Sequence, residues 1–279
     1  YQCFNPSKMK ENFKSIYIIK KEKPLHGGKR LNVKLSRPLL SIITVVLNSE
    51  KHLEETIKSV IKQKKIYEYI LIDGNSKDDS LNIIKKYSNK ISYWVSEKDE
   101  GLYYAFNKGM KLAQGSYIGI INSGDVYKDN AFDIIHKYIN KNPNADFIFG
   151  SVKKHWGILH GYRPEKIKFS WGFYSSHSTG FFIKRTSAKK VGLYNTKYKY
   201  HADYDYIYRM IVKKKLNGVA TKKNEVVGIF RRGGFSSTIP YRKLFFEELK
   251  IRYDNNQNLF LILILAIYKF FKHFKKLMV

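Results

Sequence analysis

From Leu39 onward, short apolar and β-branched runs alternate with segments of helical periodicity, and this alternation limits the possible folds more than any other feature. Leu40–Leu47 is a nearly unbroken run of this kind, which is typical of a strand buried on both faces. Strands that alternate with helices of about three turns predict βαβ crossovers, and so an α/β fold with a mostly parallel central sheet flanked by helices. The later strand-like runs are Tyr67–Ile72, Ile91–Val95 and Tyr117–Ile121, with a helix expected at Leu102–Ala113.

The chain is strongly basic, with 52 basic and 23 acidic residues and a formal net charge of +29. This balance indicates a polyanionic partner, which can be nucleic acid, anionic lipid or a phosphorylated small molecule. The acidic residues gather between Asp73 and Asp146, whereas lysine and arginine crowd both ends. Cys3 is the only cysteine, so an intrachain disulfide is impossible and a reducing, cytoplasmic compartment is expected.

Three parts are expected along the 279 residues. Residues 1–38 read as a basic N-terminal extension, and residues 39–237 as one domain whose halves meet at residue 150. Residues 238–279 read as a helical C-terminal tail. The first half of the domain holds the regular alternation, whereas the second half is less regular, with strand-like runs at Gly180–Ile183 and Val226–Phe230.

The tail contains a wholly apolar segment, Leu259–Tyr268. As a helix it would rise only about 15 Å, against roughly 30 Å of bilayer hydrocarbon, so it is too short to cross a membrane. An amphipathic helix that lies on an anionic membrane surface is therefore predicted, and docking of this helix on the domain is the alternative. The residues expected on its basic face are Lys269, Lys272, His273 and Lys276.

Polar side chains follow each of the four predicted strands of the first half. Each group alone has an ordinary explanation, since Asp-Gly after a strand is a common turn. In a parallel sheet, however, the carboxyl ends of the strands converge on one crevice, where ligands bind. Four such ends in succession therefore predict a binding site. The groups are Thr44 with Asn48, Asp73 to Ser76, Glu97 to Gly101, and Asn122 to Asp125.

In order and spacing, these motifs resemble the family 2 glycosyltransferases from about Leu39 to Ser236. Within that family they look most like the branch used in bacterial surface-polysaccharide (colanic-acid-type) assembly. The resemblance implies a GT-A fold, which is Rossmann-like, and a nucleotide-sugar donor, with a UDP-sugar favoured. The matching stretches are Ser41–Asn48, Ile72–Ser80, Ser96–Gly101, Asn107–Gly109, Ile121–Asp125, His177, Asp203–Asp205 and Gly233–Ser236.

By this resemblance the first half binds the sugar nucleotide. Asp73 would hold the base through its ring N–H, because an ionised carboxylate only accepts hydrogen bonds. Asp125 would bind Mg²⁺ or Mn²⁺, which neutralises the diphosphate leaving group. Many members carry acids where Asn122 and Gly124 stand, so Asp125 is expected to be the sole protein carboxylate on the metal. The expected nucleotide-sugar contacts are Thr44, Asn48, Asp73, Asn75, Glu97, Asp99, Asn107, Lys108, Asn122 and Asp125.

The second half would bind the acceptor. Asp203 matches the base that deprotonates the acceptor hydroxyl, which gives inversion in a single displacement, and Asp205 is the second candidate. Capping of the helix that starts at Tyr204 is the other role open to Asp203. A basic, glycine-rich turn offers arginine and backbone N–H groups to a diphosphate, although a plain surface turn fits equally well. The expected acceptor or diphosphate contacts are His177, Arg231, Gly233, Gly234 and Ser236.

The resemblance implies hexosyl or N-acetylhexosaminyl transfer to a glycan or a polyprenyl-diphosphate-linked acceptor, at the cytoplasmic face of a membrane and without a nucleic-acid partner. A basic nucleic-acid-binding protein is the main alternative, but zinc-ligand spacing, an RNP-like motif and a recognisable helix-turn-helix are all missing from the sequence. An oxidoreductase is rejected because no G-x-G-x-x-G follows the first strand. A non-catalytic relative is a third possibility, and the retained Asp73, Asp125 and Asp203 argue against it.

Overall fold

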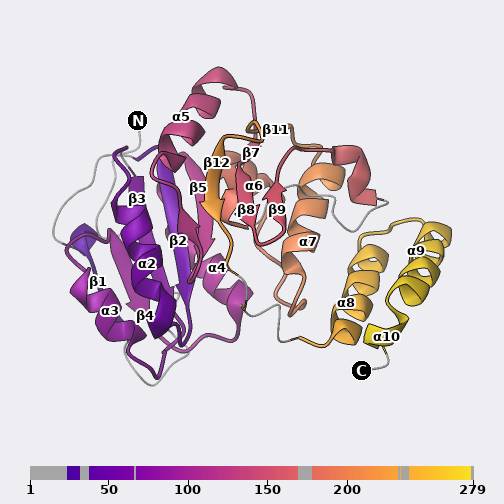
Figure 1. Ribbon diagram of the computed structural model, residues 1–279, viewed down its shortest axis with the longest axis horizontal. Coiled ribbons are helices and arrows are strands. Elements are labelled where there is room, and N and C mark those ends of the chain that lie inside the picture. The colour runs from indigo at the N-terminus through magenta and orange to yellow at the C-terminus, as the bar shows by residue number, and fades with distance from the viewer. Residues whose placement is uncertain are drawn as a thin grey trace.

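The four strands predicted in the first half lie together in an eight-stranded sheet of the computed structural model, which describes residues 24–31, 38–65, 67–168, 178–231, 233 and 239–277 (Figure 1). β2 pairs in parallel with β3 and β5, and β3 in parallel with β4, so the mostly parallel central sheet is confirmed. β1 and β10 run antiparallel to their neighbours. In spatial order the strands are β1 (Leu25–Gly27), β4 (Tyr93–Ser96), β3 (Tyr67–Asp73), β2 (Leu40–Val46), β5 (Tyr117–Asn122), β10 (Phe181–Lys184), β7 (Phe147–Phe149) and β11 (Gly218–Ala220).

Helices cover both faces of this sheet, and β2 is therefore buried at all seven positions. Ile43 packs in one core with α4, α6 and α7, whereas Ile42 packs in the other with α2, α3 and α5. α4 approaches β2 closely at Gly109, where an added Cβ would lie 2.4 Å from Ile43 Cγ2. The helices are α2 (Glu50–Ile61), α3 (Ser80–Lys86), α4 (Leu102–Leu112), α5 (Ala131–Lys141), α6 (Arg185–Val191) and α7 (Ala202–Tyr208), which continues as a π-helical turn at Arg209–Lys213.

A second, four-stranded sheet ties the two halves of the domain together. β12 pairs antiparallel with β6, which directly follows the end of β5, so that Ile229 lies opposite Val126. The chain after β12 is thereby brought to the carboxyl end of β5. In spatial order the strands are β6 (Val126–Tyr127), β12 (Val226–Ile229), β8 (Ser151–Lys154) and β9 (Gly157–Leu159).

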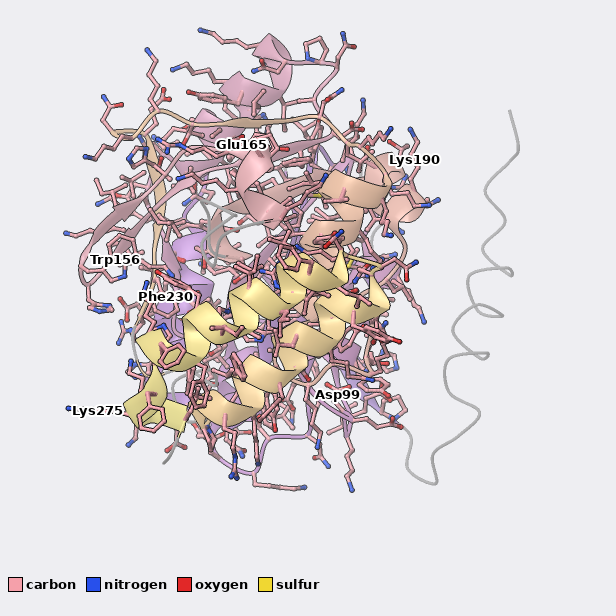
Figure 2. The ribbon with its side chains drawn as sticks, turned by 90° about the vertical axis from the view of Figure 1, so that its right-hand side faces the viewer. Asp99, Trp156, Glu165, Lys190, Phe230 and Lys275 are labelled. Atoms are coloured by element: carbon pink, nitrogen blue, oxygen red, sulfur yellow. The ribbon has the colours of Figure 1, made fainter. Side chains whose placement is uncertain are left out.

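The C-terminal tail forms three helices, α8 (Tyr241–Asp254), α9 (Leu259–Lys272) and α10 (Phe274–Leu277), at the opposite end of the molecule from β1 (Figure 1). α8 and α9 lie side by side, and α8 also packs on α7 (Figure 2). The expected single basic face is not present. The helix breaks at His273, and Lys269 is buried because it pairs with Glu248 of α8.

Part of the basic N-terminal extension is built into the edge of the large sheet. β1 pairs with β4, and Arg30 Nη1 lies 2.9 Å from the buried Glu68 Oε1. Ser41 Oγ donates to the other oxygen of Glu68 at 2.6 Å, so this buried carboxylate is well satisfied. The rest of the extension lies outside the described residues.

Candidate active site

The loops that follow β2 and β3 are hydrogen-bonded to each other. The Asn48 N–H donates to Ser76 Oγ at 2.9 Å, and Asn48 Oδ1 accepts from the Lys77 N–H at 2.8 Å. Asn48 has a φ of 49° and Asn75 a φ of 65°, left-handed conformations that asparagine tolerates better than most residues. The fold thus places two expected donor-side residues, Asn48 and Asn75, on adjoining loops at the carboxyl ends of the strands.

Thr44 and Asp73 lie inside the fold at these strand ends, and both are fully buried. Thr44 Oγ1 lies 3.1 Å from Tyr69 OH within the core, so this position does not support the expected contact between Thr44 and the nucleotide. Asp73 accepts from Ser96 Oγ at 2.6 Å and from Ser76 Oγ at 2.5 Å. Asp73 therefore joins the ends of β3 and β4, and its contact with a base stays a prediction that would require these bonds to exchange.

Glu97, Asp99 and Lys108 form a charged cluster beside these loops. Lys108 Nζ lies 2.7 Å from Glu97 Oε1 and 2.6 Å from Asp99 Oδ1, and the three side chains are only 9–14% exposed. Burial disfavours the charged amine, but the two carboxylates raise the pKa of Lys108. With two negative charges and one positive charge, the cluster has a net negative charge. It can therefore accept hydrogen bonds from N–H and O–H groups, such as those of a nucleoside.

Asp125 follows β5 and is held by contacts from other elements. Its Oδ2 accepts from Thr179 Oγ1 at 2.7 Å and its Oδ1 from the Arg231 N–H at 3.0 Å, while its backbone carbonyl accepts from Thr56 Oγ1 at 2.8 Å. Burial raises the pKa of Asp125 to about 6, although the bonds from Thr179 and Arg231 favour the ionised form. A buried carboxylate with a raised pKa would gain from a cation beside it.

The surroundings of Asp125 fit a divalent cation. Asn122 Oδ1 and Ser123 Oγ are buried and have no hydrogen-bond partner within the part of the chain that the structure describes. Asn122 Nδ2 donates to Ser178 Oγ at 3.0 Å, which leaves Oδ1 as the free end of the amide. Oxygen is the ligand atom that Mg²⁺ and Mn²⁺ prefer. Among the described residues no group of three or more His, Cys, Asp or Glu could hold a metal ion.

Arg231 connects the end of β12 to the loop of Asp125. Its Nε donates to the Gly124 carbonyl at 3.1 Å, its Nη1 lies 2.8 Å from His52 Nδ1, and its Nη2 pairs with Glu55. The expected diphosphate contact and the expected metal carboxylate are therefore neighbours. Gly233 is exposed, with a φ of 101°. Three more expected contacts lie outside the described residues: His177, Gly234 and Ser236.

Asp203 lies in the first turn of α7. Its Oδ1 accepts from the Tyr204 N–H at 2.9 Å and lies 3.3 Å from Tyr103 OH, which also donates to the Tyr200 carbonyl at 2.9 Å. The bond to the Tyr204 N–H satisfies one donor at the start of the helix, as the capping role requires. Burial raises the pKa of Asp203, and the charge of His201 opposes this effect. A raised pKa makes the carboxylate a better proton acceptor.

Helix α4 connects the two halves of the site. Tyr103 lies beside Asp203, and Asn107, one turn later, exchanges two hydrogen bonds of 2.9 Å with the backbone of Tyr194. Lys108 on the same helix binds the cluster of the first half. The side-chain amide of Asn107 is buried and used in these two bonds, so Asn107 fixes the second half of the domain to α4 and does not lie open to a nucleotide as expected.

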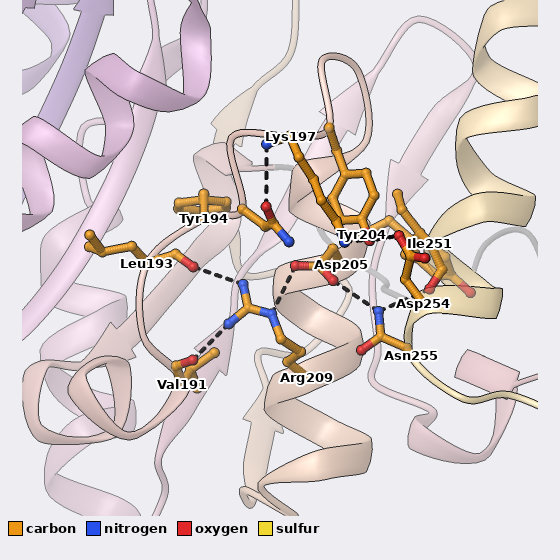
Figure 3. A network of polar contacts seen from close by, with 12 residues as sticks. Val191, Leu193, Tyr194, Lys197, Tyr204, Asp205, Arg209, Ile251, Asp254 and Asn255 are labelled. Carbon is orange, nitrogen blue, oxygen red and sulfur yellow. Dashed lines mark hydrogen bonds and ion pairs between the residues drawn. The ribbon is translucent and has the colours of Figure 1, made fainter.

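Asp205 lies in a different environment from Asp203, although both are on α7 (Figure 3). Its Oδ2 accepts from Arg209 Nε at 2.8 Å and its Oδ1 from Asn255 Nδ2 at 2.9 Å. Arg209 also donates to the carbonyls of Val191 and Leu193. One oxygen of Asp205 is therefore used within α7 and its continuation, and the other joins α7 to the end of α8, so the geometry favours Asp203 over Asp205 as the base.

Asp205→Asn should destabilise the fold and leave the proposed base in place. Removing one partner of a buried ion pair costs about 3 kcal/mol, which corresponds to a fall of roughly 5–10 °C in Tm. Thermal unfolding at pH 7 would measure it. Asp129→Asn is the matched control, because Asp129 is 76% exposed and, among the described residues, pairs with the exposed Lys62 alone, so its Tm should hardly change. A wild-type Tm for Asp205→Asn would contradict this role of Asp205.

Two further contacts at the site gave no signal in the sequence. Lys154 on β8 interacts electrostatically with Asp125; burial lowers the pKa of this lysine, and the carboxylate partly offsets the effect. Glu247 on α8 accepts three backbone N–H groups, those of residues 199–201, at 2.6–2.8 Å. These bonds fix the chain that leads into Asp203. Neither Lys154 nor Glu247 lies in a motif, so only the fold reveals them.

The sequence matches the family described as "Glycosyl transferase family 2" over residues 41–201. It is 27% identical over 240 residues to an uncharacterized glycosyltransferase of Methanocaldococcus jannaschii, covering 80% of this chain and 82% of the relative.

Solved structures show the same fold at low sequence identity. TarS 1–349 of S. aureus in complex with UDP-GlcNAc has a TM-score of 0.60 at 16% identity, over 79% of this chain and 67% of that chain. The chain spans only 40% of the longer TarS structure. The mannosyltransferase PcManGT of Pyrobaculum calidifontis, in complex with GDP-Man and Mn2+, has a TM-score of 0.59 at 12% identity, over 90% and 72%. These likenesses support the GT-A fold.

Proposed function

Because the chain belongs to glycosyl transferase family 2, we propose that it moves a hexosyl or N-acetylhexosaminyl group from a nucleotide-sugar donor to a hydroxyl of a glycan or lipid-linked acceptor, with inversion. The observation that carries the proposal is a pair of carboxylates with raised pKa, the buried Asp125 in the first half and the half-buried Asp203 in the second. Such perturbed groups mark functional sites, and this reaction needs one to carry a cation and one to accept a proton.

On the donor side, Asp125 would hold Mg²⁺ or Mn²⁺, and the ion would neutralise the diphosphate as the sugar leaves it. The chain adds positive charge of its own, since Arg231 is fixed on the Asp125 loop and Lys154 interacts with the same carboxylate. The adjoining loops of Asn48 and Asn75 would receive the nucleoside. A UDP-sugar is favoured, because TarS has been solved with UDP and with UDP-GlcNAc; the complex of PcManGT with GDP-Man makes GDP the second class to test.

On the acceptor side, Asp203 would remove the proton of the attacking hydroxyl. The acceptor oxygen then forms a bond to the anomeric carbon as the bond from that carbon to the diphosphate oxygen breaks. The proton stays on Asp203 and the nucleoside diphosphate leaves. Tyr103 and the backbone N–H of Tyr204 orient Oδ1 of Asp203. Within the described ranges, no other residue donates a hydrogen bond to Oδ2. Oδ2 is therefore the atom we assign to proton transfer.

The tail supports a place at the cytoplasmic face of a membrane, in cell-surface polysaccharide synthesis. α9 exposes apolar side chains at helical spacing: Phe260 (71%), Ile264 (46%), Ile267 (49%) and Phe271 (74%). Residues 259–277 contain lysines and no acid, which suits anionic lipid. None of the helices that the structure describes is both long and apolar enough to span a bilayer. An interfacial position of α9 is consistent with its 14 residues, a rise of about 21 Å.

Release of nucleoside diphosphate from a panel of nucleotide sugars tests this function. We expect release from one donor class with Mn²⁺, and a pH dependence set by Asp125. Its carboxylate must be ionised to bind the ion and its pKa is about 6, so the apparent affinity for Mn²⁺ should be constant above pH 6 and fall about tenfold per pH unit below it. Asp129→Asn, at an exposed position, should behave like wild type. A pH-independent affinity between pH 5 and 7 would contradict the role of Asp125.

A further inference from the structure

A pocket of about 270 Å³ lies between the start of α7, helix α8 and the junction of α9 with α10. One water molecule occupies about 30 Å³ of liquid, so the pocket has room for a phosphate or diphosphate group. His201 precedes α7 and is two residues from Asp203, which places the pocket next to the proposed base. The lining residues are His201, Tyr241, Leu244, Phe245, Glu248, Lys269, Lys272 and His273.

The charge of the lining favours an anion. Glu248 is the only acid in it, and Glu248 already pairs with Lys269 and, at 3.0 Å, with Arg252. Arg252 is fully buried and does not line the pocket, so the lining itself has two lysines, Lys269 and Lys272, against one carboxylate. Nδ1 of His201 is buried without a hydrogen-bond partner in the described part of the chain. A polar atom left in this state gains from a ligand that can bond to it.

The position of the pocket relates it to the exposed apolar face of α9. Lys272 and His273 directly follow Phe271, which is 74% exposed and belongs to that face. If α9 lies in the membrane interface with this face toward the acyl chains, the pocket entrance stands at the depth of lipid headgroup phosphates. α8 links the pocket to the base, because Glu247 holds the backbone of residues 199–201 and Glu248, the next residue, lines the pocket.

We propose that this pocket binds the phosphate group of a lipid-linked acceptor while the apolar face of α9 rests in the membrane. The inference rests on the proposed function and adds a site to it, since the sugar nucleotide binds in the first half of the domain. It also assigns Lys272 and His273 to acceptor binding, apart from the general attraction of a basic tail to anionic lipid.

The test is calorimetric titration of the full chain in EDTA with farnesyl diphosphate, an isoprenyl diphosphate, and with inorganic pyrophosphate. Two double variants are compared. Lys272→Gln with His273→Gln alters the pocket, and Lys275→Gln with Lys276→Gln removes two lysines from α10 just beyond it (Figure 2). We expect the first to weaken farnesyl diphosphate binding at least tenfold and the second to leave it within about twofold of wild type. Wild type should bind farnesyl diphosphate at least tenfold more tightly than pyrophosphate, because in the absence of a membrane the apolar face of α9 can contact the isoprenyl chain.

Equal affinities of the two double variants for farnesyl diphosphate would overturn the assignment of phosphate binding to this pocket. Equal affinities of wild type for pyrophosphate and farnesyl diphosphate would overturn the claim that the phosphate belongs to a lipid. Binding to phosphatidylglycerol vesicles separates bulk charge from the pocket, since there both double variants should lose affinity to a similar extent. Nucleoside diphosphate release is measured on the same samples. If nucleoside diphosphate release is normal but the pocket variant binds farnesyl diphosphate like the control variant, this inference alone is wrong. If wild type releases no nucleoside diphosphate, the proposed function is wrong.

Discussion

Asp203→Asn will lower the rate of sugar transfer by about 10³-fold and leave donor binding within about twofold of wild type. A positioned general base contributes about 10²–10⁴-fold, and an amide cannot take up the proton. Asparagine keeps the shape of the side chain and can still accept from the Tyr204 N–H, so the fold should be unchanged. Initial rates at saturating donor, with the Kd of the nucleoside diphosphate measured separately, give the two quantities.

Asp205→Asn is the matched comparison, because the two aspartates are two residues apart on α7. The contacts predict opposite results. Asp203→Asn should lower the transfer rate without changing Tm, whereas Asp205→Asn should lower Tm and keep the transfer rate per folded molecule within a few fold of wild type. Arg209 and Asn255 already occupy both oxygens of Asp205 (Figure 3). If Asp203→Asn kept its rate while Asp205→Asn lost it without unfolding, the base would be Asp205 and our assignment would be wrong.

Asp125→Asn should reduce transfer by about 10³-fold and abolish its dependence on Mn²⁺. A metal ion supplies several kcal/mol of charge stabilisation to the departing diphosphate, and each 1.4 kcal/mol is about a factor of ten in rate. The single oxygen of asparagine can still accept from the Arg231 N–H, and its NH2 group can donate to Thr179 Oγ1, so the loop should keep its place. The measurement is the transfer rate as a function of Mn²⁺ concentration for wild type, Asp125→Asn and the surface control Asp129→Asn.

The contacts also define the result that would contradict this role. Lys154 and Arg231 stand close to Asp125 and could by themselves neutralise a diphosphate. If wild type is fully active in EDTA and Lys154→Gln removes that activity, the positive charge comes from the chain and not from a metal ion on Asp125.

Much of the fold follows from the sequence, because strands buried on both faces leave an unbroken apolar signal. Leu40–Leu47 predicts β2 to within one residue, and Tyr67–Ile72 predicts β3 equally well. The tail was harder to predict, because helical periodicity gives spacing along one helix and not its partners. Lys269 has the spacing of a surface lysine, and only the packing of α9 on α8 brings it to Glu248.

The candidate site, too, could be predicted from the sequence only in part. The order of the motifs locates the strand ends, and the fold brings Asp125 to Arg231 across more than a hundred residues. The motifs do not indicate which way each side chain faces. Thr44 faces Tyr69 in the core, and Asn107 faces the backbone of Tyr194, because long-range packing decides both.

The most direct test of the central claim is the thermal stability of the full chain with UDP, GDP and dTDP, each with and without Mn²⁺. A ligand that binds only the folded state at about a hundred times its Kd adds about 2.7 kcal/mol. We predict that one nucleoside diphosphate, with UDP favoured, raises the Tm only when Mn²⁺ is present, and that Asp125→Asn abolishes the shift. No shift with any of the three in Mn²⁺, together with a salt-sensitive shift with DNA, would contradict the glycosyltransferase assignment and support a nucleic-acid-binding protein.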